Sequence, residues 1–500
     1  MLTIKPPVGY ASIALGVAAL HAVLWFTIQS PPCQDVPFHV AAAELIARSR
    51  SAPLEFFTVN TLFWRPNTGF EQVASRFPAL PPSAWIVVYL LAVVSTASAT
   101  ARRARGSPVL AACTLLSVYN LNFSVGLVGF CLGIAAVLWT AFLLDTPAVR
   151  PRWPHALGVT LLTIAAFYIH VFAAVVCLSM VVLWVALHDD RRHKWPLLVG
   201  LLPALFLILL WIRLDPGEQS RQDLAYLWRY YDHDYVRTFP RRLALLAVVD
   251  QRHWTASVPG QVGIALVALS VQTWAGWHIF RAAPETRRER LRSPWAILFL
   301  VAATAALVLP PDMVSHYFLY QRFASIATLA LIVLAASMPS KASPTGRSSL
   351  VRVLIPTLLL AHFVLVVDYA RAFDRSARSG RELLRTAAQQ GGRIAGLLNG
   401  VDFRGRELYR HFQDYYVLAG GEGIVSGLSD FRLQILEKAV PDSVLPTRQP
   451  FGPNLHYRGQ YDQVEHILYI DLPDGCGFDD LLAGRDLEHD GRWTLASRRR

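Results

Sequence analysis

Long apolar runs separated by short polar segments dominate the first 370 residues of the chain. The runs cover roughly 8–28, 83–100, 107–119, 124–144, 156–187, 196–213, 259–280, 293–309, 322–338 and 351–369. Most of them approach the ~20 residues that an α-helix needs to cross the hydrocarbon core of a bilayer. This pattern predicts an α-helical polytopic membrane protein.

The run at 156–187 fits either one overlong helix or a tight hairpin that turns near Tyr168-Ile169-His170. Positively charged loops favour the cytoplasmic side of a membrane. The hairpin keeps the cluster at 191–194 on the same side as the other arginine-rich loops, near 102–105, 150–152, 281–292 and 341–352. We therefore expect about eleven transmembrane helices, a cytoplasmic N-terminus and an outer C-terminus, in a multi-pass membrane protein.

Three larger polar segments fall on the outer side: a loop at 29–82, a loop at 214–258 and a tail at 370–500. The tail scatters charged residues among short apolar stretches. Strand-like segments occur at Arg393–Leu398, at His466–Ile470 and around Trp493, and a helix is expected at Glu407–Ala419. The chain is thus predicted to hold a transmembrane domain over 1–369 and a small outer (periplasmic) α/β domain over 370–500.

Composition agrees with this reading and excludes others. Hydrophobic residues make up 54% of the chain and charged residues only 16%, which is too apolar for a soluble protein. The net charge of +12 is explained by arginines in cytoplasmic loops, so no nucleic-acid partner is predicted. No Cys-x-x-Cys spacing or Cys/His cluster indicates a metal site.

A candidate base stands at the start of the first outer loop, in Gln34-Asp35-Val36-Pro37-Phe38-His39. If a helix begins near Val36, Asp35 and His39 are four residues apart and share one face. A carboxylate beside an imidazole at the membrane surface can take a proton from a hydroxyl group. Asp35 is equally suited to cap the helix, with Pro37 in its first turn.

Candidate substrate-binding residues lie at other outer turns. Arg322 enters the tenth predicted span from outside, six residues after His316 and with no acid in the adjacent sequence. A guanidinium so placed suits a phosphate, although it can also reach back to the membrane interface. His170 marks the tip of the predicted hairpin, where hydrogen bonding alone would explain it. Asn120 and Asn122 could bind sugar hydroxyls, but asparagine in a turn is ordinary.

The second outer loop interleaves aromatic residues and arginines. Such a pattern predicts an interfacial amphipathic helix that lines the approach of an amphiphilic substrate or anchors the loop. The residues concerned are Tyr226, Trp228, Arg229, Tyr230, Tyr231, Tyr235, Arg237, Arg241 and Arg242.

Together these features resemble the GT-C superfamily of integral-membrane glycosyltransferases. The likeness rests on Asp35 in the first outer loop, about eleven spans, aromatic outer loops and a small outer C-terminal domain. The segments at Asn120–Gly133, Tyr168–Phe172 and Arg393–Gly421 are similar to those of uncharacterised bacterial members. Within the last segment, Arg410-His411-Phe412-Gln413-Asp414-Tyr415-Tyr416 followed by Gly420-Gly421 adds to it.

The resemblance implies transfer of a hexose or pentose, with inversion, from a polyprenyl-phosphate donor to a glycan, lipid or protein acceptor on the outer face. It implies Asp35 as base and Arg322 as a phosphate contact, with His316 and His170 as further candidates. Val36 replaces the second acid of the Asp-Glu pair of protein mannosyltransferases. The first outer loop lacks an Asp-x-Asp motif, so metal dependence in the manner of the oligosaccharyltransferases is not supported. A divalent metal stays open, and no other cofactor is predicted. The resemblance also implies a location in the bacterial inner membrane.

Three other functions remain open. An O-antigen polymerase or ligase would depend on Arg237, Arg241, Arg242 and His253 more than on Asp35. A non-catalytic lipid or glycan transporter would place acids within its spans, and the predicted span cores contain none. An assembly protein would use the outer tail to bind partners.

Overall fold

The structure, a computed structural model, describes residues 9–60, 62–146, 152–188, 191–214, 230–248, 257–311, 319–339, 347–398, 402–425, 436–441, 444, 461–471 and 481–499. Contacts divide the chain into two compact units. The first comprises 1–24, 86–123 and 129–367, and the second comprises 25–85, 124–128 and 368–500. The loop at 29–82 thus folds into one unit with the C-terminal tail, and not with the transmembrane helices that flank it in sequence.

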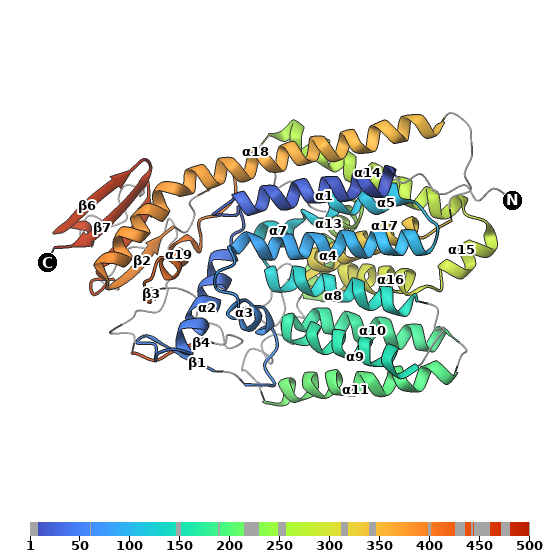
Figure 1. The fold of residues 1–500 in the computed structure, drawn as a ribbon, viewed down its shortest axis with the longest axis horizontal. Helices are drawn as coiled ribbons and strands as arrows, with labels where there is room; N and C mark the ends of the chain where they lie inside the picture. The colour runs from blue at the N-terminus through green and yellow to red at the C-terminus, as the bar shows by residue number, and fades with distance from the viewer. Residues whose placement is uncertain are drawn as a thin grey trace. The chain divides into compact units, whose positions relative to one another are not determined.

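The first unit is helical (Figure 1). Its helices, some of which continue into the second unit, are α1 (Gly9–Thr27), α4 (Pro82–Arg103), α5 (Pro108–Ala112), α6 (Thr114–Val118), α7 (Leu121–Val125), α8 (Val128–Leu144), α9 (Arg152–Ile169), α10 (Val171–Leu187), α11 (Arg191–Leu214), the π-helix η1 (Tyr230–Asp234), α13 (Tyr235–Val248), α14 (Val258–Arg281), α15 (Pro284–Arg290), α16 (Pro294–Val308), α17 (Leu319–Ala336) and α18 (Arg347–Gln390).

Among the described residues, six helices are long and apolar enough to cross a membrane, or seven if the bent pair α15 and α16 forms one span. Four shorter apolar helices accompany them, at Gly16–Thr27, Val128–Leu144, Trp153–Ile169 and Val171–Leu187. The predicted helical membrane protein is therefore confirmed. The count of eleven spans and the sidedness of the termini stay predictions.

The hairpin predicted at 156–187 is present. α9 ends at Ile169 and α10 begins at Val171, because His170 adopts an extended backbone with φ −165° and ψ 119°. The two helices pack against each other, and α11 packs against α9, so the three lie side by side in Figure 1. A single extended residue is thus enough to turn the chain back on itself.

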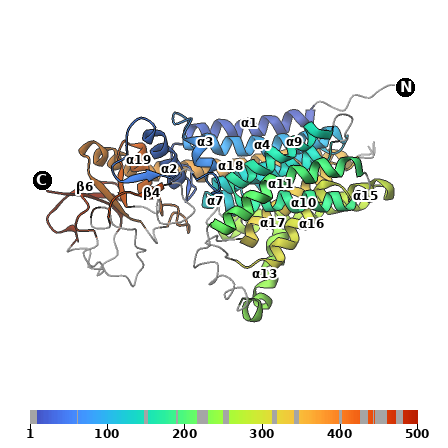
Figure 2. The same ribbon diagram turned by 90° about the horizontal axis from the view of Figure 1, so that it is seen from below.

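α17 occupies the interior of the first unit. It packs against α13, α14 and α16, and Figure 2 shows it beside α16. Of its 18 residues, 94% are buried. Polar side chains on α17 consequently face other helices rather than lipid, and each must find a hydrogen-bond partner or a ligand there.

The second unit combines loop and tail. From the loop come α2 (Val36–Ser49), β1 (Phe57–Val59) and α3 (Gly69–Ala74). From the tail come the end of α18, then β2 (Arg393–Leu397), the 3₁₀ turn η3 (Phe412–Asp414), α19 (Tyr415–Leu418), β3 (Gly423–Val425), β4 (Leu436–Lys438), β5 (His466–Ile470), β6 (Arg485–Asp490) and β7 (Trp493–Arg498). β1 pairs antiparallel with β4, so loop and tail share a two-stranded sheet.

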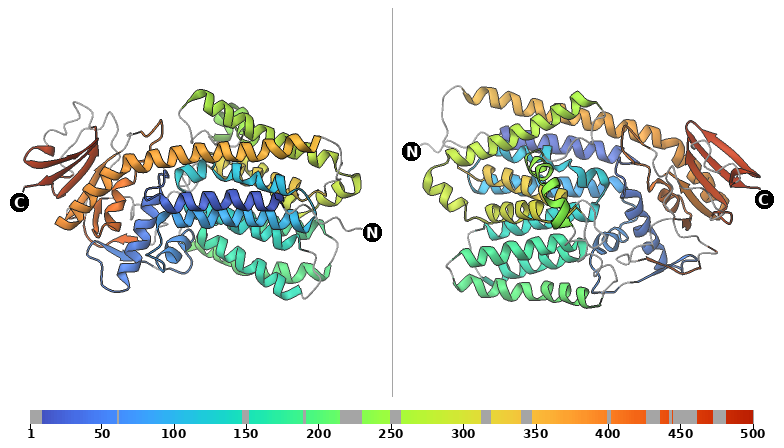
Figure 3. Two further views of the ribbon diagram at one scale, coloured as in Figure 1. Left: turned by 45° about the horizontal axis from the view of Figure 1, so that its top comes forward. Right: turned by 180° about the vertical axis from the view of Figure 1, so that it is seen from behind.

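The other sheet has the strand order β3-β2-β5-β7-β6. β2 runs parallel to β3 and β5, whereas β7 runs antiparallel to β5 and β6. β6 and β7 form the red hairpin at the edge of this sheet in Figure 3. All five residues of β5 are buried, as expected for a central strand. The strands predicted at 393–398, at 466–470 and around Trp493 are confirmed, and so is an α/β tail.

The helix predicted at Glu407–Ala419 is wrong in extent. Only η3 and α19, at 412–418, are helical. Arg404 and Gly405 have φ values of +49° and +80°, and Gly420 has +111°. These left-handed residues turn the chain before and after this stretch, and residues 407–411 between them are not helical.

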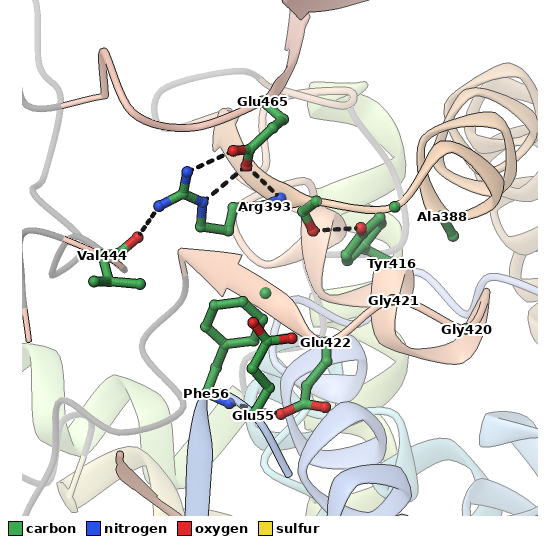
Figure 4. Close-up of a pocket in the computed structure, with 13 residues that line it drawn as sticks. Glu55, Phe56, Ala388, Arg393, Tyr416, Gly420, Gly421, Glu422, Val444 and Glu465 are labelled. Atoms are coloured by element: carbon green, nitrogen blue, oxygen red, sulfur yellow. Dashed lines mark hydrogen bonds and ion pairs between the residues drawn. The ribbon is translucent and has the colours of Figure 1, made fainter. Parts of the chain in front are cut away.

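An ion pair fastens the start of β2 (Figure 4). Glu465 accepts hydrogen bonds from Arg393 through its backbone N at 2.7 Å and its Nε at 2.8 Å. Burial acts to raise the pKa of Glu465, but these hydrogen bonds and the positive charge of Arg393 outweigh it and hold the pKa below its usual value. The pair is therefore stabilising while Glu465 is ionised, and that stability is lost as the pH falls through the lowered pKa.

We predict that Glu465→Gln lowers the Tm of the detergent-purified protein at pH 7, by the equivalent of about 1 kcal/mol. The difference from wild type should shrink as the pH falls through the lowered pKa of Glu465, where the wild-type carboxylate becomes protonated as well. Thermal unfolding followed by tryptophan fluorescence over a pH series measures this. Glu382→Gln is the matched control, because the Glu382–Arg385 pair is more than half exposed and its loss should not move the Tm. A Tm difference between wild type and Glu465→Gln that stays constant from pH 7 to pH 3 would contradict the prediction.

Candidate active site

Backbone hydrogen bonds hold Asp35 in place within the second unit. The Asp35 N–H donates to Val125 O at 2.8 Å, and the Gln34 N–H donates to Ser124 O at 3.3 Å. Asp35 precedes the first residue of α2, yet its side chain makes no capping hydrogen bond. The carboxylate is 23% exposed. The hypothesis that the Asp35 side chain caps α2 is therefore wrong, because its carboxylate oxygens make no hydrogen bond to the first backbone N–H groups of the helix.

Gly126 makes this anchoring possible. Its φ is +83°, and a Cβ atom at this position would lie 2.8 Å from the backbone N of Asp35 and 2.9 Å from that of Val36. Any other residue would adopt a disfavoured backbone conformation and would also press on the two amides that fix the start of α2. The placement of Asp35 thus depends on a glycine 91 positions further along the chain.

His39 finds its carboxylate partner in α3. Its Nδ1 lies 2.6 Å from Oε1 of Glu71, whose side chain is only 8% exposed. Burial acts to lower the pKa of His39, but the hydrogen bond and charge of Glu71, and the charge of Asp35, together raise it above its usual value. The sequence predicted that His39 stands beside a carboxylate, but it did not identify Glu71 as the hydrogen-bonded one.

A second histidine faces Asp35, and it comes from the tail. Nε2 of His411 lies 3.7 Å from Oδ1 of Asp35, and its Nδ1 lies 3.4 Å from Oδ2 of Asp414. The Asp414 side chain is fully buried. The sequence alone indicated no role for His411 or Asp414. The only feature that singled them out was the His-x-x-Asp spacing at 411–414, within the segment that carries the family resemblance.

Arg322 and His170 meet inside the first unit. Arg322 lies in the first turn of α17, is 4% exposed, and donates from Nη1 to Nε2 of His170 at 2.8 Å. The guanidinium also stands over the ring of Phe130, at 5.3 Å. Arg322 is thus buried against α8 and the 169–171 hairpin turn instead of reaching to a membrane surface. The hairpin tip and the arginine, proposed separately from sequence, form one cluster.

The contact fixes the tautomer of His170. A guanidinium can only donate, so Nε2 accepts and the ring proton lies on Nδ1. The Phe172 N–H, 3.3 Å from Nδ1, would also require an acceptor there. A neutral imidazole cannot accept at both nitrogens, and the shorter contact to Arg322 decides.

The two asparagines have different surroundings. Asn122 donates from Nδ2 to Ser325 Oγ at 3.0 Å, and Ser325 lies one turn after Arg322 on α17. Asn120 accepts from the Asn122 N–H at 3.0 Å and donates to Ser117 O at 3.0 Å. Asn122, on α7, therefore contacts the polar face of α17, whereas Asn120 makes hydrogen bonds within the turn before α7. His316 lies outside the described residues.

Arg242, from the aromatic loop at 214–258, points into the protein. It lies on α13, is 1% exposed, and donates from Nη1 to Leu307 O at 3.0 Å. Its guanidinium also stands over Tyr320 at 4.8 Å. This arginine anchors α13 to the end of α16 and the start of α17. Tyr226, Trp228, Arg229 and His253 lie outside the described residues.

A polar pocket of about 450 Å³ opens in the second unit (Figure 4). Glu55, Glu422 and Tyr416 line it, together with the glycine turns at 391–392 and 420–421. Arg48 donates to Gly420 O and Gly421 O at 3.1 and 2.9 Å, so α2 connects Asp35 at one end with the pocket rim at the other. Within the described ranges, no group of three or more His, Cys, Asp or Glu side chains is placed to hold a metal ion.

Comparison with known proteins shows the fold. No family model and no curated protein matches the chain. Among solved structures it is similar to the arabinofuranosyltransferase AftD from Mycobacteria, with a TM-score of 0.52 and 13% identity over 97% of this chain and 39% of that one. ArnT from Cupriavidus metallidurans in the apo state also matches, with a TM-score of 0.44 and 11% identity over 97% of both chains. The chain spans less than half the length of AftD, and the likeness to AftD shows that the two chains share a fold.

We predict that Gly126→Ala destabilises the protein by about 1–3 kcal/mol, because alanine is strained at positive φ and its Cβ meets the amides of Asp35 and Val36. Urea or thermal unfolding in detergent measures the loss. Gly276→Ala is the matched control, since a Cβ on that α14 glycine meets nothing within 4 Å. Equal stability of the two variants would show that the turn at 124–128 does not hold Asp35 as described.

Proposed function

We propose that the chain, whose fold is similar to that of the arabinofuranosyltransferase AftD, moves a sugar from a polyprenyl-phosphate donor to an acceptor on the outer face of the bacterial inner membrane. The observation that carries this proposal is how the backbone and side chain of Asp35 are held. Its backbone is fixed by the 124–128 turn, its side chain does not cap α2, and its carboxylate is partly exposed. A base must combine these properties: a fixed position and an oxygen that an incoming hydroxyl can reach.

In the proposed reaction Asp35 accepts the proton of the acceptor hydroxyl. The hydroxyl oxygen forms a bond to C1 of the sugar as the bond between C1 and the phosphate oxygen breaks. The bonding electrons leave with the polyprenyl phosphate, and the proton taken up by Asp35 is released after the transfer. Attack opposite the leaving phosphate inverts the configuration at C1, which is the stereochemistry we propose.

Arg322 is proposed to bind the phosphate of the donor. A guanidinium matches two phosphate oxygens in a bidentate arrangement and keeps its charge at any physiological pH. His170 supports this role because it accepts from Nη1 and holds the guanidinium in one orientation. Asn122 and Ser325 extend the same polar face of α17 and are candidates for hydrogen bonds to the donor. His39, paired with Glu71, is proposed to add positive charge near Asp35.

The polymerase or ligase alternative requires arginines of the 214–258 loop to face the substrate. Arg242 is buried against carbonyl oxygens of α16 and its end, whereas Arg237 and Arg241 on α13 are exposed. Within the described residues, this alternative therefore depends on Arg237 and Arg241. The transporter and assembly alternatives require no base. They differ from the proposed function in the lipids that the protein should retain.

We predict that Asp35→Asn copurifies with a polyprenyl-phosphate sugar that wild type turns over. Asparagine keeps the backbone bonds of Asp35 but cannot accept a proton, so the bound donor should accumulate. Mass spectrometry of extracted lipids measures this and identifies the sugar. Asp486→Asn is the matched control, because Asp486 is 71% exposed on β6 and should leave the lipid content of wild type unchanged.

Two results would count against the proposal. If both Asp35→Asn and wild type lack any polyprenyl-phosphate species, the donor assignment fails and a transporter or assembly role takes its place. If both carry a polyprenyl-pyrophosphate glycan, the polymerase or ligase alternative is favoured.

A further inference from the structure

The imidazole of His411 stands between two carboxylates in the second unit. Asp35 faces its Nε2 at 3.7 Å and Asp414 faces its Nδ1 at 3.4 Å. The two nitrogens lie on opposite sides of the ring, so a proton gained at one changes the hydrogen bonding at the other. The order carboxylate, imidazole, carboxylate is the arrangement in which a buried acid can orient a histidine toward a reacting group.

The burial of Asp414 limits what His411 can do beside it. Its side chain is completely buried, and among the described residues neither of its carboxylate oxygens accepts a hydrogen bond. An ionised carboxylate in such a place is costly unless a proton donor or a cation faces it. Nδ1 of His411, 3.4 Å from Oδ2 of Asp414, can supply that charge once the imidazole has gained a proton. When only Nδ1 carries a proton, Nε2 is left to accept one from Asp35.

Neighbouring residues hold the His411 ring between the two carboxylates. Phe38, from the first turn of α2, meets it edge-on with the ring centroids 5.3 Å apart. The Asp414 N–H donates to His411 O at 3.0 Å and closes the turn that carries both residues. Arg48 of α2 binds the carbonyl oxygens of Val417, Gly420 and Gly421 just beyond that turn. The helix that follows Asp35 therefore also grips the segment that supplies His411.

We propose that His411 and Asp414 are positioning residues for Asp35 in the glycosyl transfer proposed above, on which this inference rests. When Asp35 takes the proton of the acceptor hydroxyl, its new O–H donates to Nε2 of His411 or passes the proton to it. The resulting imidazolium is stabilised by Asp414, and the proton leaves to solvent after the polyprenyl phosphate departs. No oxidant or further reactant is needed.

Double-mutant kinetics test the coupling. The detergent-purified full chain is given synthetic undecaprenyl-phosphate pentoses and hexoses, and release of undecaprenyl phosphate is followed, with water serving as acceptor where no other is known. Asp35→Asn and His411→Gln should each lower kcat by about 100-fold or more, with little change in KM. The double variant should be no slower than Asp35→Asn alone, because His411 acts only through Asp35. His489→Gln, an exposed histidine of β6, is the matched control and should behave as wild type.

Two further measurements separate positioning from a structural role. Imidazole added to His411→Ala should restore at least 10-fold of the lost rate, which it cannot do for Asp35→Asn. His411→Ala should also lower the Tm by leaving Asp414 buried without its partner, and a second substitution, Asp414→Asn, should recover part of that loss while the rate stays low.

The outcomes discriminate. Losses that multiply in the double variant, or a His411→Gln variant as fast as wild type, overturn the inference and leave the proposed function standing. A fall in Tm without a fall in kcat reduces His411 to a structural partner of Asp414 and overturns it equally. Absence of turnover by wild type with every lipid-linked sugar overturns the proposed function and this inference together.

Discussion

A carboxylate that acts as a base has to be held in one place while its oxygens stay accessible, and the hydrogen bonds of Asp35 with the 124–128 turn satisfy both demands. They act on the backbone, so the side chain is not used for anchoring. They require Gly126, because a side chain there would displace the amides of Asp35 and Val36. The contacts around Asp35 follow from this placement. Because α2 starts at Val36, His39 meets Glu71 and Phe38 meets the ring of His411.

Burial of charge is the second constraint, and it acts differently in the two units. In the first unit Arg322 lies on a helix that is almost entirely buried, and a histidine with a defined tautomer and an aromatic ring accompany its guanidinium. In the second unit Asp414 is buried with a histidine as its partner. Uncompensated charges at such positions would cost several kcal/mol, so both sites persist only if other contacts of the fold offset that cost. Such pre-organised charge is what a phosphate-binding group and a base require.

The sequence predicts those features whose physical cause is local. Apolar runs reveal the helices, loop charge reveals the hairpin at His170, and short strand-like stretches indicate β2, β5 and β7. The sequence also identifies Asp35 as a candidate base, although the same pattern fits a helix cap. It misjudges the extent of the helix at 407–419, where only 412–418 is helical and Arg404 and Gly405, just before it, have left-handed backbones. Composition gave no warning of that, since Arg404 is not a residue that favours positive φ.

The partners of Asp35 and His39 could not be predicted, because they depend on long-range packing. Glu71 reaches His39 only once α3 folds onto α2, and His411 reaches Asp35 only because the loop at 29–82 joins the tail in one unit. No spacing in the sequence encodes a contact between residues 35 and 411. What the sequence offers is the identity of each side chain, and the fold decides which of them meet.

The most direct test of the account is the rate at which purified wild type and Asp35→Asn release undecaprenyl phosphate from a radiolabelled undecaprenyl-phosphate sugar under identical detergent conditions. The account predicts measurable turnover by wild type and a rate at least about 100-fold lower for Asp35→Asn, at equal donor binding. Equal rates for the two proteins would show that Asp35 is not the base and would contradict the central claim.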